Sequence, residues 1–451
     1  MTRTPIFQQT SFGLVKGSSD GLTQRFSGLR YGWANRYQAP QAYHYQQAEI
    51  DASQPAPIAA QPNIYFKEYF FQQNYSQQEQ TEQPQILSIY RPMNTKPTDK
   101  LPVMVWIHGG AFTNGSGESS EYTPDLLVAQ ENLIVVNISY RLGVLGYLRD
   151  ENGKLANLGL LDQILALKWI KQYIAEFGGD PTQITLFGQS AGAESVRDIL
   201  LADGTEELVQ RAIIQSAPIG AAYADRKAMS ESMLANFLDL PIDAPLADVL
   251  AKQVEIEETT KVHNLARFMK FAPHFGVYPL PRIEDIPQRL AQRAKQVELL
   301  IGSNSREVAS FLPTMPRVAG LVDKKLAKRT TELVVKKLSR AIFNQPAKDF
   351  ALAYSQAGGS VHLYHFFWQE KAHLVAAGHD LELPLLFNFA DFPDSPFLLG
   401  ASWDDTKQAG IPLRQVWGQF AKTGKVDLAG IPDMLSIEKL DDAATAVGRK
   451  D

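Results

Sequence analysis

Short apolar runs alternate with helical patterns along most of this chain. The runs are rich in β-branched residues, which is typical of strands buried on both faces, and they lie at residues 86–90, 103–107, 133–140, 184–187 and 212–215. Between them apolar residues recur at helical spacing, most clearly over residues 160–177, where Gly178 and Gly179 end the pattern. This alternation predicts an α/β fold with a mostly parallel central sheet flanked by helices.

Two stretches interrupt the alternation. Residues 72–85, "QQNYSQQEQTEQPQ", are rich in glutamine and are predicted to form a polar surface loop. Residues 222–275 carry many charges and weaker helical patterns, which indicates a helical cap inserted over the sheet. Because no internal repeat or proline-rich linker is present, we expect residues 1–451 to form one domain that contains this insertion.

Composition narrows the possible functions. The 451 residues carry a net charge of −5 without a long block of lysine or arginine, so neither nucleic acid nor an anionic membrane is an expected partner. The apolar runs are too short to span a bilayer, and the N-terminus lacks the apolar segment of a signal peptide. Cysteine is absent, which excludes disulfides, thiolate metal sites and a cysteine nucleophile. We expect a cytoplasmic protein that is a monomer or a weak homodimer.

A serine follows one of the predicted strands in a G-x-S-x-G turn. The stretch "ITLFGQSAGAESVRDILLA" places a strand, this turn and a helix in succession, which is the context that gives the motif meaning. Gly188 and Gly192 let strand and helix approach closely, so that Ser190 sits at a strained corner with its hydroxyl exposed. The N–H of Ala191 faces the same spot at the helix N-terminus and favours negative charge there. We therefore predict that Ser190 is a nucleophile.

A second motif, "VMVWIHGGAFTNGSG" at residues 103–117, leads from a strand into a glycine-rich loop. Acyl transfer develops an oxyanion, which backbone N–H groups hold only where side chains do not block the approach. Gly109, Gly110 and Ala111 meet that condition. A phosphate-binding loop is the alternative, but its spacing requires a lysine that is missing here.

A serine nucleophile needs a histidine to take its proton and a carboxylate to orient the imidazole. In the order serine, acid, histidine, the base lies far downstream on a loop, so His373 and His379 are preferred to His362 and His365, which lie in an apparent strand. Spacing alone leaves the two preferred histidines unresolved. It also leaves the acid open among Glu307, Asp323, Asp349 and Glu370.

Several longer stretches share a resemblance that spans nearly the whole chain. They are residues 26–40, 105–112, 138–148, 157–192, 212–218, 302–311, 376–387 and 417–424, of which "NLGLLDQILALKWIKQYIAEFGGDPTQITLFGQSAG" is the most specific. In these stretches the chain resembles the type-B carboxylesterase and cholinesterase family, most closely its bacterial para-nitrobenzyl-esterase-like members. The resemblance implies an α/β-hydrolase fold with a helical cap insertion and a small-molecule ester as substrate. It implies no metal and no organic cofactor.

The resemblance also assigns roles by position. It makes Ser190 the nucleophile, Glu307 the acid and His379 the base. The oxyanion hole would consist of the N–H groups of Gly110, Ala111 and Ala191, with Gly109 shaping the loop. Ser216 would be a hydroxyl near this triad, although Ala217 replaces a glycine of the family pattern. Two ion pairs that brace the family fold have counterparts in Arg36 with Glu82 and Arg141 with Asp162.

Three departures from the family pattern affect the expected site. Val308 follows Glu307 where the family usually has glycine, and a β-branched residue tolerates positive φ badly, so this loop could differ. The spacing of 72 residues between Glu307 and His379 is compact, which suggests that a cap element is trimmed. Gln189 stands where the family often has glutamate, which predicts a weaker preference for cationic esters.

The sequence thus predicts a serine carboxylic-ester hydrolase that acts on small to medium neutral esters through an acyl-enzyme. One alternative is a catalytically silent, cholinesterase-like binding protein, although silent members usually lose a residue of the triad. Another is hydrolysis of amides or carbamates by the same triad. Action on long-chain lipids is disfavoured, since no large apolar lid is evident.

Overall fold

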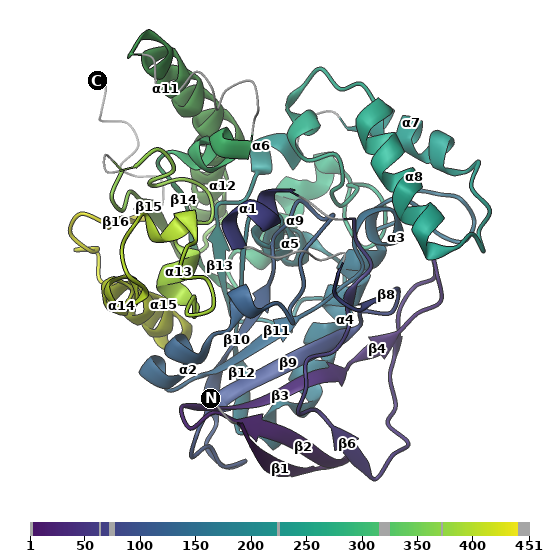
Figure 1. Cartoon of the computed structure of the whole chain (residues 1–451), viewed down its shortest axis with the longest axis vertical. Coiled ribbons are helices and arrows are strands. Elements are labelled where there is room, and N and C mark those ends of the chain that lie inside the picture. Colours follow the sequence, from purple (N-terminus) through teal and green to yellow (C-terminus); the bar gives the residue numbers. More distant parts are fainter. Residues whose placement is uncertain are drawn as a thin grey trace.

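The fold is built on one twisted sheet. The computed structural model describes residues 3–62, 65–71, 77–222, 226–314, 325–370 and 373–440. The sheet has 12 strands (Figure 1), in the order β1 (Thr4–Thr10), β2 (Gly13–Ser19), β3 (Thr23–Arg30), β9 (Ile86–Pro92), β11 (Ile134–Ile138), β10 (Leu101–Ile107), β12 (Gly179–Gln189), β13 (Arg211–Gln215), β14 (Glu298–Asn304), β15 (Val361–Phe366) and β16 (Leu435–Leu440), with β6 (Glu49–Asp51) beside β2.

The centre of the sheet is parallel and its edges are antiparallel. Strands β11 through β15 run parallel in the order given. At one edge β1, β2, β3 and β9 are antiparallel to one another and β9 is antiparallel to β11, while β16 is antiparallel at the other edge. The short β6 pairs with β2 in parallel. Four of the five predicted strand regions fall within strands of this centre or its neighbour β9, and the fifth, 133–140, contains β11 but extends beyond it at both ends. The antiparallel edges were not predicted, because β1 and β2 are partly exposed and lack continuous apolar runs.

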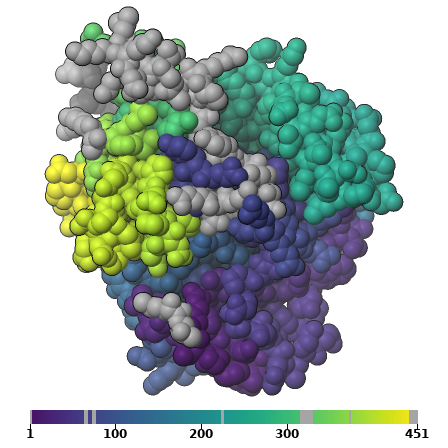
Figure 2. All heavy atoms as spheres, viewed as in Figure 1, coloured from purple at the N-terminus to yellow at the C-terminus, as the bar shows by residue number. Residues whose placement is uncertain are grey.

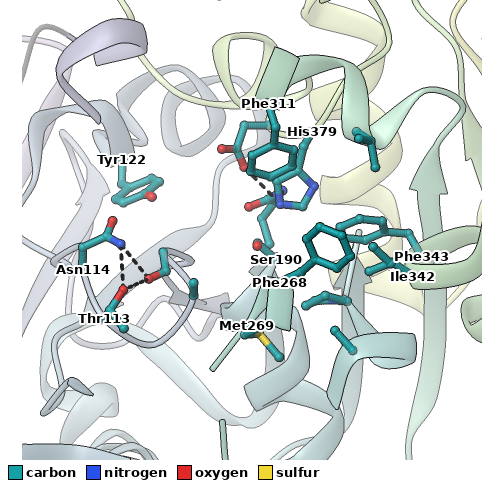
Figure 3. Close-up of a pocket in the computed structure, with 17 residues that line it drawn as sticks. Thr113, Asn114, Tyr122, Ser190, Phe268, Met269, Phe311, Ile342, Phe343 and His379 are labelled. Atoms are coloured by element: carbon teal, nitrogen blue, oxygen red, sulfur yellow. Dashed lines mark hydrogen bonds and ion pairs between the residues drawn. The ribbon is translucent and has the colours of Figure 1, made fainter. Parts of the chain in front are cut away.

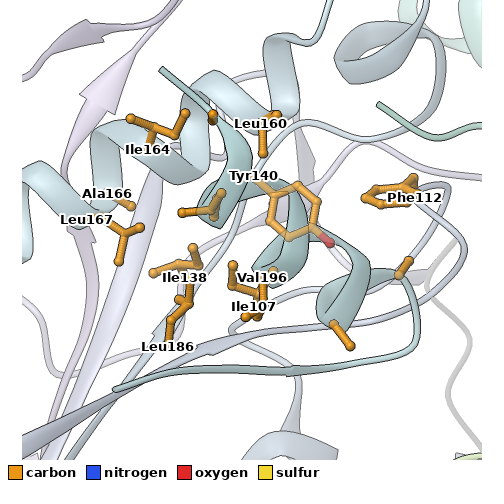
Figure 4. Close-up of a cluster of buried hydrophobic side chains, with 14 of the residues drawn as sticks. Ile107, Phe112, Ile138, Tyr140, Leu160, Ile164, Ala166, Leu167, Leu186 and Val196 are labelled. Atoms are coloured by element: carbon orange, nitrogen blue, oxygen red, sulfur yellow. The ribbon is translucent and has the colours of Figure 1, made fainter. Parts of the chain in front are cut away.

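The sheet separates two hydrophobic cores. Successive side chains of a strand point to opposite faces, so Val103, Val105 and Ile107 of β10 enter one core while Met104 and Trp106 enter the other. The first core is covered by α4 (Leu158–Tyr173) and α5 (Ala191–Leu201), and the second by α2 (Asp125–Glu131) and α15 (Ile411–Thr423). Figure 4 shows part of the first core, in which Ile107, Ile138 and Leu186 of the strands lie below Leu160, Ile164 and Leu167 of α4, and Val196 of α5 lies close to Ile107.

The predicted helix at 160–177 is confirmed with one refinement. Its last turn tightens into the 3-10 helix η3 (Ile174–Phe177), and Gly178 then takes a left-handed conformation with φ of 90°. Glycine adopts this conformation without a steric penalty, which ends the helix and turns the chain into β12.

The described part of the 222–275 segment, residue 222 and residues 226–275, contains the helices that its pattern predicted. They include α7 (Lys227–Phe237), α8 (Leu246–Thr259) and the 3-10 helix η4 (Leu265–Phe268). These helices stand to one side of the sheet in Figure 1, and the space-filling view shows the same teal residues as a lobe at the upper right, away from the purple N-terminal strands (Figure 2). Asn157 anchors the end of this segment, because its Nδ2 donates to the carbonyls of His274 and Val277 at 3.0 and 2.9 Å.

The predicted glutamine-rich loop at 72–85 is described only from residue 77 onward, and residues 72–76 lie outside the described ranges. Its described part includes the short strand β8 (Gln80–Thr81), paired with β7 (Ile58–Ala59).

The other elements are β4 (Gly32–Trp33), β5 (Gln41–Ala42), α1 (Tyr65–Phe71), η2 (Ser120–Tyr122), α3 (Gly143–Tyr147), α6 (Ile219–Ala222), η5 (Ile283–Asp285), α9 (Ile286–Arg293), η6 (Glu307–Thr314), α11 (Lys325–Ser339), η7 (Arg340–Asn344), α12 (Gln345–Gln356), α13 (Leu383–Leu386), η8 (Pro396–Leu398) and α14 (Trp403–Ala409). Within the described ranges, no helix is long and apolar enough to cross a membrane.

Both expected ion pairs are present, in different surroundings. Arg141 donates from Nε and Nη2 to the two carboxylate oxygens of Asp162, each at 2.8 Å, and both side chains are buried. The Arg36 Nε donates to Glu82 at 2.6 Å, but this pair is partly exposed. The Arg141 pair joins the end of β11 to α4, where Asp162 also accepts from the Arg141 N–H at 3.0 Å.

We predict that Asp162→Ala lowers the free energy of unfolding by about 3–5 kcal/mol, because it leaves the buried Arg141 guanidinium without its counter-charge. Urea denaturation followed by circular dichroism measures the change. Asp404→Ala is the matched control, since the Asp404–Lys407 pair is exposed and its loss should cost under about 1 kcal/mol. Equal destabilisation by both variants would contradict the expectation.

Candidate active site

The turn between β12 and α5 holds Ser190 in a strained conformation. Its backbone φ and ψ are 58° and −127°, a combination that residues other than glycine rarely adopt. The turn is packed tightly against the sheet, because a Cβ on Gly188 would lie 2.6 Å from the backbone carbon of Gly192 and 2.8 Å from the carbonyl oxygen of Ile107. The Ser190 N–H donates to the carbonyl of Gln215 at 2.9 Å, which fixes the corner to β13.

The glycine-rich loop after β10 lies directly beside this corner. A Cβ on Gly109 would come within 3.1 Å of the Ser190 Cβ and 2.8 Å of the Gln189 carbonyl oxygen. Gly110 and Ala111 both have positive φ, of 112° and 53°. The structure records no hydrogen bond from the N–H of Gly110 or Ala111 to any other described residue, whereas the Gly110 carbonyl accepts from the Asn114 Nδ2 at 2.8 Å. The loop is therefore held in place, while the backbone N–H groups of Gly110 and Ala111 stay available to donate hydrogen bonds.

His379 is paired with Glu307. The His379 Nδ1 lies 2.6 Å from the Glu307 Oε2 and its backbone N–H donates to the Glu307 carbonyl at 3.0 Å. The rings of Phe311 and Phe343 flank the imidazole, with centroids at 5.4 and 5.0 Å. Both members of the pair are buried. Since Nδ1 donates to a carboxylate, the neutral imidazole accepts at Nε2.

The other candidates for base and acid lie elsewhere. His362 and His365 are on β15, and His373 is exposed at the surface. Asp349 is an exposed residue of α12 that accepts from Gln345, and Glu370 lies in the turn after β15. Asp323, the remaining candidate acid, lies outside the described residues.

The loop after Glu307 does not require glycine. Val308 is not among the residues with positive φ, and it continues into η6. Its N–H donates to the Ser339 Oγ at 3.0 Å. The valine is therefore compatible with this backbone, and the expected difficulty at this position does not arise.

A second carboxylate, Glu382, lies behind the pair. Asn304 bridges the two acids, because its backbone N–H donates to Glu307 Oε1 at 2.7 Å and its Nδ2 donates to Glu382 Oε2 at 2.8 Å. Burial, together with the nearby charge of Glu307, raises the pKa of Glu382 to about 7. Glu382 lies in the same sequence stretch as His379, but no pattern in that stretch predicts a role for it.

Two side chains lie near the outer nitrogen of His379. The Nε2 of Gln189 is 3.2 Å from His379 Nε2, and the Oδ1 of Asp380 is 3.9 Å from it. Burial disfavours the imidazolium, but the carboxylates of Asp380 and Glu307 outweigh this effect and raise the pKa of His379 to about 9. Ser190 lies beside His379 in Figure 3. Both residues are described, and the structure records no hydrogen bond between the Ser190 Oγ and the His379 imidazole.

Ser216 was expected near the triad. It follows Gln215, the residue of β13 whose carbonyl accepts from the Ser190 N–H. Its φ is 54°, its N–H donates to the Gly302 carbonyl at 2.9 Å, and its buried Oγ has no hydrogen-bond partner within the described part of the chain. It is not among the described residues that line the pocket.

Ser190, His379 and the glycine-rich loop line one pocket of about 280 Å³ (Figure 3). Apart from the Ser190 corner and the glycine-rich loop, most of its wall is apolar. Phe268 and Met269 come from the 222–275 segment, while Ile342 and Phe343 come from the π-helix η7. Sequence patterns did not reveal these wall residues, since they look like ordinary core positions.

Comparisons with known proteins identify the family of the chain. The sequence signature described as the carboxylesterase family matches residues 5–341. A probable N-octanoylanthranilate hydrolase of Rhodococcus erythropolis is 33% identical over 426 residues, covering 92% of each protein. The para-nitrobenzyl esterase of Bacillus subtilis strain 168 is 32% identical over 456 residues, covering 92% of this chain and 89% of that protein. The solved structure of a thermophilic PNB esterase matches with a TM-score of 0.77 at 27% identity, over 97% of this chain and 98% of that one.

The architecture is thus that of an α/β hydrolase, with a large mixed sheet between helices. Within that class the chain belongs to the carboxylesterase family and is a carboxylic ester hydrolase. The resemblance to para-nitrobenzyl-esterase-like members and the α/β-hydrolase fold that it implied are both confirmed.

Proposed function

We propose that the protein hydrolyses small to medium neutral carboxylic esters through an acyl-enzyme on Ser190, with His379 as base and Glu307 as acid. The observation that carries the proposal is the 2.6 Å contact between Glu307 and His379, because His379 lines the same pocket as Ser190 and the glycine-rich loop. A buried carboxylate that accepts from Nδ1 leaves Nε2 to act as the base.

In the first half-reaction His379 Nε2 takes the hydroxyl proton of Ser190 as Oγ bonds to the ester carbonyl carbon. The carbonyl electrons move onto oxygen, and the N–H groups of Gly110, Ala111 and Ala191 stabilise the oxyanion. Collapse of this intermediate expels the alkoxide, which the imidazolium protonates. Water then attacks the acyl-enzyme by the same route and releases the carboxylic acid. The strained Ser190 corner supports this role because it holds the hydroxyl in place before the substrate arrives.

The size and composition of the pocket support the substrate range. Its volume of about 280 Å³ is near the lower end for small-molecule sites, and most of its lining is apolar. We propose that residues 222–275 act as the cap, since Phe268 and Met269 line the pocket. The alternative of a catalytically silent protein has no support from the site, because serine, carboxylate and histidine are all retained.

Amide hydrolysis is the second candidate. It is favoured by the relative of 33% identity, whose name gives N-octanoylanthranilate as its substrate. The same serine attack applies to an amide, but the leaving nitrogen must be protonated before it departs.

We predict that a fluorophosphonate probe labels Ser190 in the folded protein and that Ser190→Ala abolishes the labelling. The variant should also lose ester hydrolysis by about 10³-fold or more, because the nucleophile is gone. Peptide mass spectrometry identifies the labelled residue, and unfolded protein is the control for non-specific reaction. A folded wild-type protein that remains unlabelled at Ser190 would disprove the nucleophile assignment.

We predict that kcat/KM for a neutral ester rises with pH and is half-maximal near pH 9. His379 acts as a base only when neutral, and its raised pKa keeps it protonated below that value. Asp380→Asn is the matched variant, since it removes one carboxylate that stabilises the imidazolium and should move the midpoint to lower pH. Initial rates at constant ionic strength test this, and a wild-type midpoint at or below the ordinary histidine value would contradict it.

We predict that para-nitrophenyl esters of short and medium acyl chains are hydrolysed with kcat/KM about tenfold or more above the palmitate ester. Long chains exceed the space that the pocket offers and gain no further burial. The comparison is made below the micellar concentration of each ester, so that access to monomeric substrate is equal. Preference for the palmitate ester would overturn the proposed substrate range.

A further inference from the structure

Two adjacent parts of the pocket wall come from different segments of the chain. Ala221 belongs to α6, whereas Met269 directly follows η4, and the two elements pack against each other. Both side chains are buried and line the pocket, and Met269 lies below Ser190 in the view of Figure 3. The separation of these segments therefore sets the room that an ester has on this side of the pocket.

Arg226 links the two segments. Its Nη1 donates to the Ala221 carbonyl at 3.2 Å, and its Nη2 donates to the carbonyl of Lys270, the neighbour of Met269, at 2.7 Å. Among the described residues, no hydrogen bond is recorded directly between α6 and residues 265–270. Because the guanidinium is planar, its two outer nitrogens keep a fixed spacing, so the two carbonyls that they bind are held at a fixed separation.

On its other side the segment that contains Met269 is attached to α8. The Lys270 Nζ donates to the carbonyl of Thr260 at 2.9 Å and to the carbonyl of Glu257, at the end of this helix. These bonds fix Met269 relative to α8 but not relative to α6. The spacing across the pocket therefore depends on Arg226.

Charge keeps Arg226 in place. Its side chain is buried, and the carboxylates of Glu194 and Asp198, both on α5, act on its guanidinium. Burial lowers the pKa of Arg226 to about 10, while the two carboxylates oppose this decrease. Arg226 is therefore a cation near neutral pH, and a cation forms stronger hydrogen bonds than a neutral donor. Since α5 begins directly after Ser190, the helix that follows the proposed nucleophile also orients Arg226.

We propose that Arg226 is a positioning residue that sets the chain length this site accepts: by holding Ala221 and Met269 at a fixed separation, it keeps the pocket fitted to esters of medium length. The inference rests on the proposed ester hydrolysis at Ser190. Arg226 is not among the described residues that line the pocket, so it acts on the substrate through the wall and not by contact. Without this link the wall is free to move away from α6, which removes more contacts from a chain that fills the pocket than from a short one.

Two series of esters test the proposal. In the first, para-nitrophenyl acetate is compared with para-nitrophenyl hexanoate, which varies the acyl chain. In the second, ethyl acetate is compared with hexyl acetate, which varies the alcohol. The measured quantity in each series is the ratio of kcat/KM for the long ester to that of the short one. All rates are taken at one pH, so a change in the protonation of the histidine base affects both esters alike and cancels.

Arg226→Met removes both donors and keeps a side chain of similar length. It should lower the long-to-short ratio by about tenfold in the series whose chain reaches this wall, which corresponds to the lost burial of about two methylene groups. The change should appear more in KM than in kcat, because the reacting groups are not altered. Arg226→Lys keeps the charge but offers one nitrogen in place of a fork, so its ratio should lie between those of wild type and Arg226→Met.

Arg293→Met is the matched control. Arg293 is also buried and donates to the backbone carbonyls of Leu200, Thr205 and Glu206, but neither it nor these partners are among the described residues that line the pocket. The variant should lose a similar amount of thermal stability, because buried carbonyls are left unpaired in both cases, and should keep the wild-type ratios.

The outcomes separate the two levels of the proposal. If wild type hydrolyses para-nitrophenyl acetate but a folded Arg226→Met leaves both ratios unchanged, or Arg293→Met shifts them equally, the role of Arg226 is wrong and the proposed function stands. A folded Arg226→Lys with the wild-type ratios has the same meaning, and it decides alone if Arg226→Met does not fold. If wild type does not hydrolyse para-nitrophenyl acetate, or Ser190→Ala hydrolyses it equally well, the proposed function itself fails.

Discussion

The close passage of the β10 and β12 backbones at their carboxyl ends is the constraint on which the site depends. Parallel pairing sets Ile107 opposite Gly188, so the loop after β10 and the corner after β12 emerge side by side. They can share this space only because Gly109 and Gly188 lack side chains that would meet backbone atoms within 2.8 Å. The donors of the loop and the Ser190 hydroxyl therefore face one another without any long-range adjustment of the fold.

Local patterns were sufficient to predict the elements that this constraint uses. The central strands, the helix at 160–177 and the two glycine-containing turns each have a signal within a short stretch of sequence. The pairing of Glu307 with His379 has none, because the residues are 72 positions apart and meet only after β14 and β15 pair in parallel. Residue spacing left the acid and the base open for that reason, and only the family resemblance distinguished them. The antiparallel edge strands were missed because partial exposure weakens their apolar pattern.

Three carboxyl groups surround a single buried imidazole, which raises the question of how the site tolerates so much like charge. All three stabilise the imidazolium of His379, while burial and the nearby charges of Glu307 and Asp380 oppose the ionisation of Glu382 and raise its pKa to about 7. Glu382 therefore holds a proton part of the time near neutrality, and Asn304 keeps Glu307 and Glu382 in place. The polar network therefore orients Glu307 without requiring two adjacent buried charges.

Reaction and specificity are built from different parts of the chain. The Ser190 corner and the glycine-rich loop follow central strands, whose register is fixed by burial on both faces. The wall of the pocket instead comes from Phe268 and Met269 after α8, from Ile342 in a π-helix, and from Asp380 in a left-handed turn. None of these four positions belongs to a strand of the sheet. Membership of the family therefore establishes ester hydrolysis, whereas the shape and lining of the pocket determine which ester fits it.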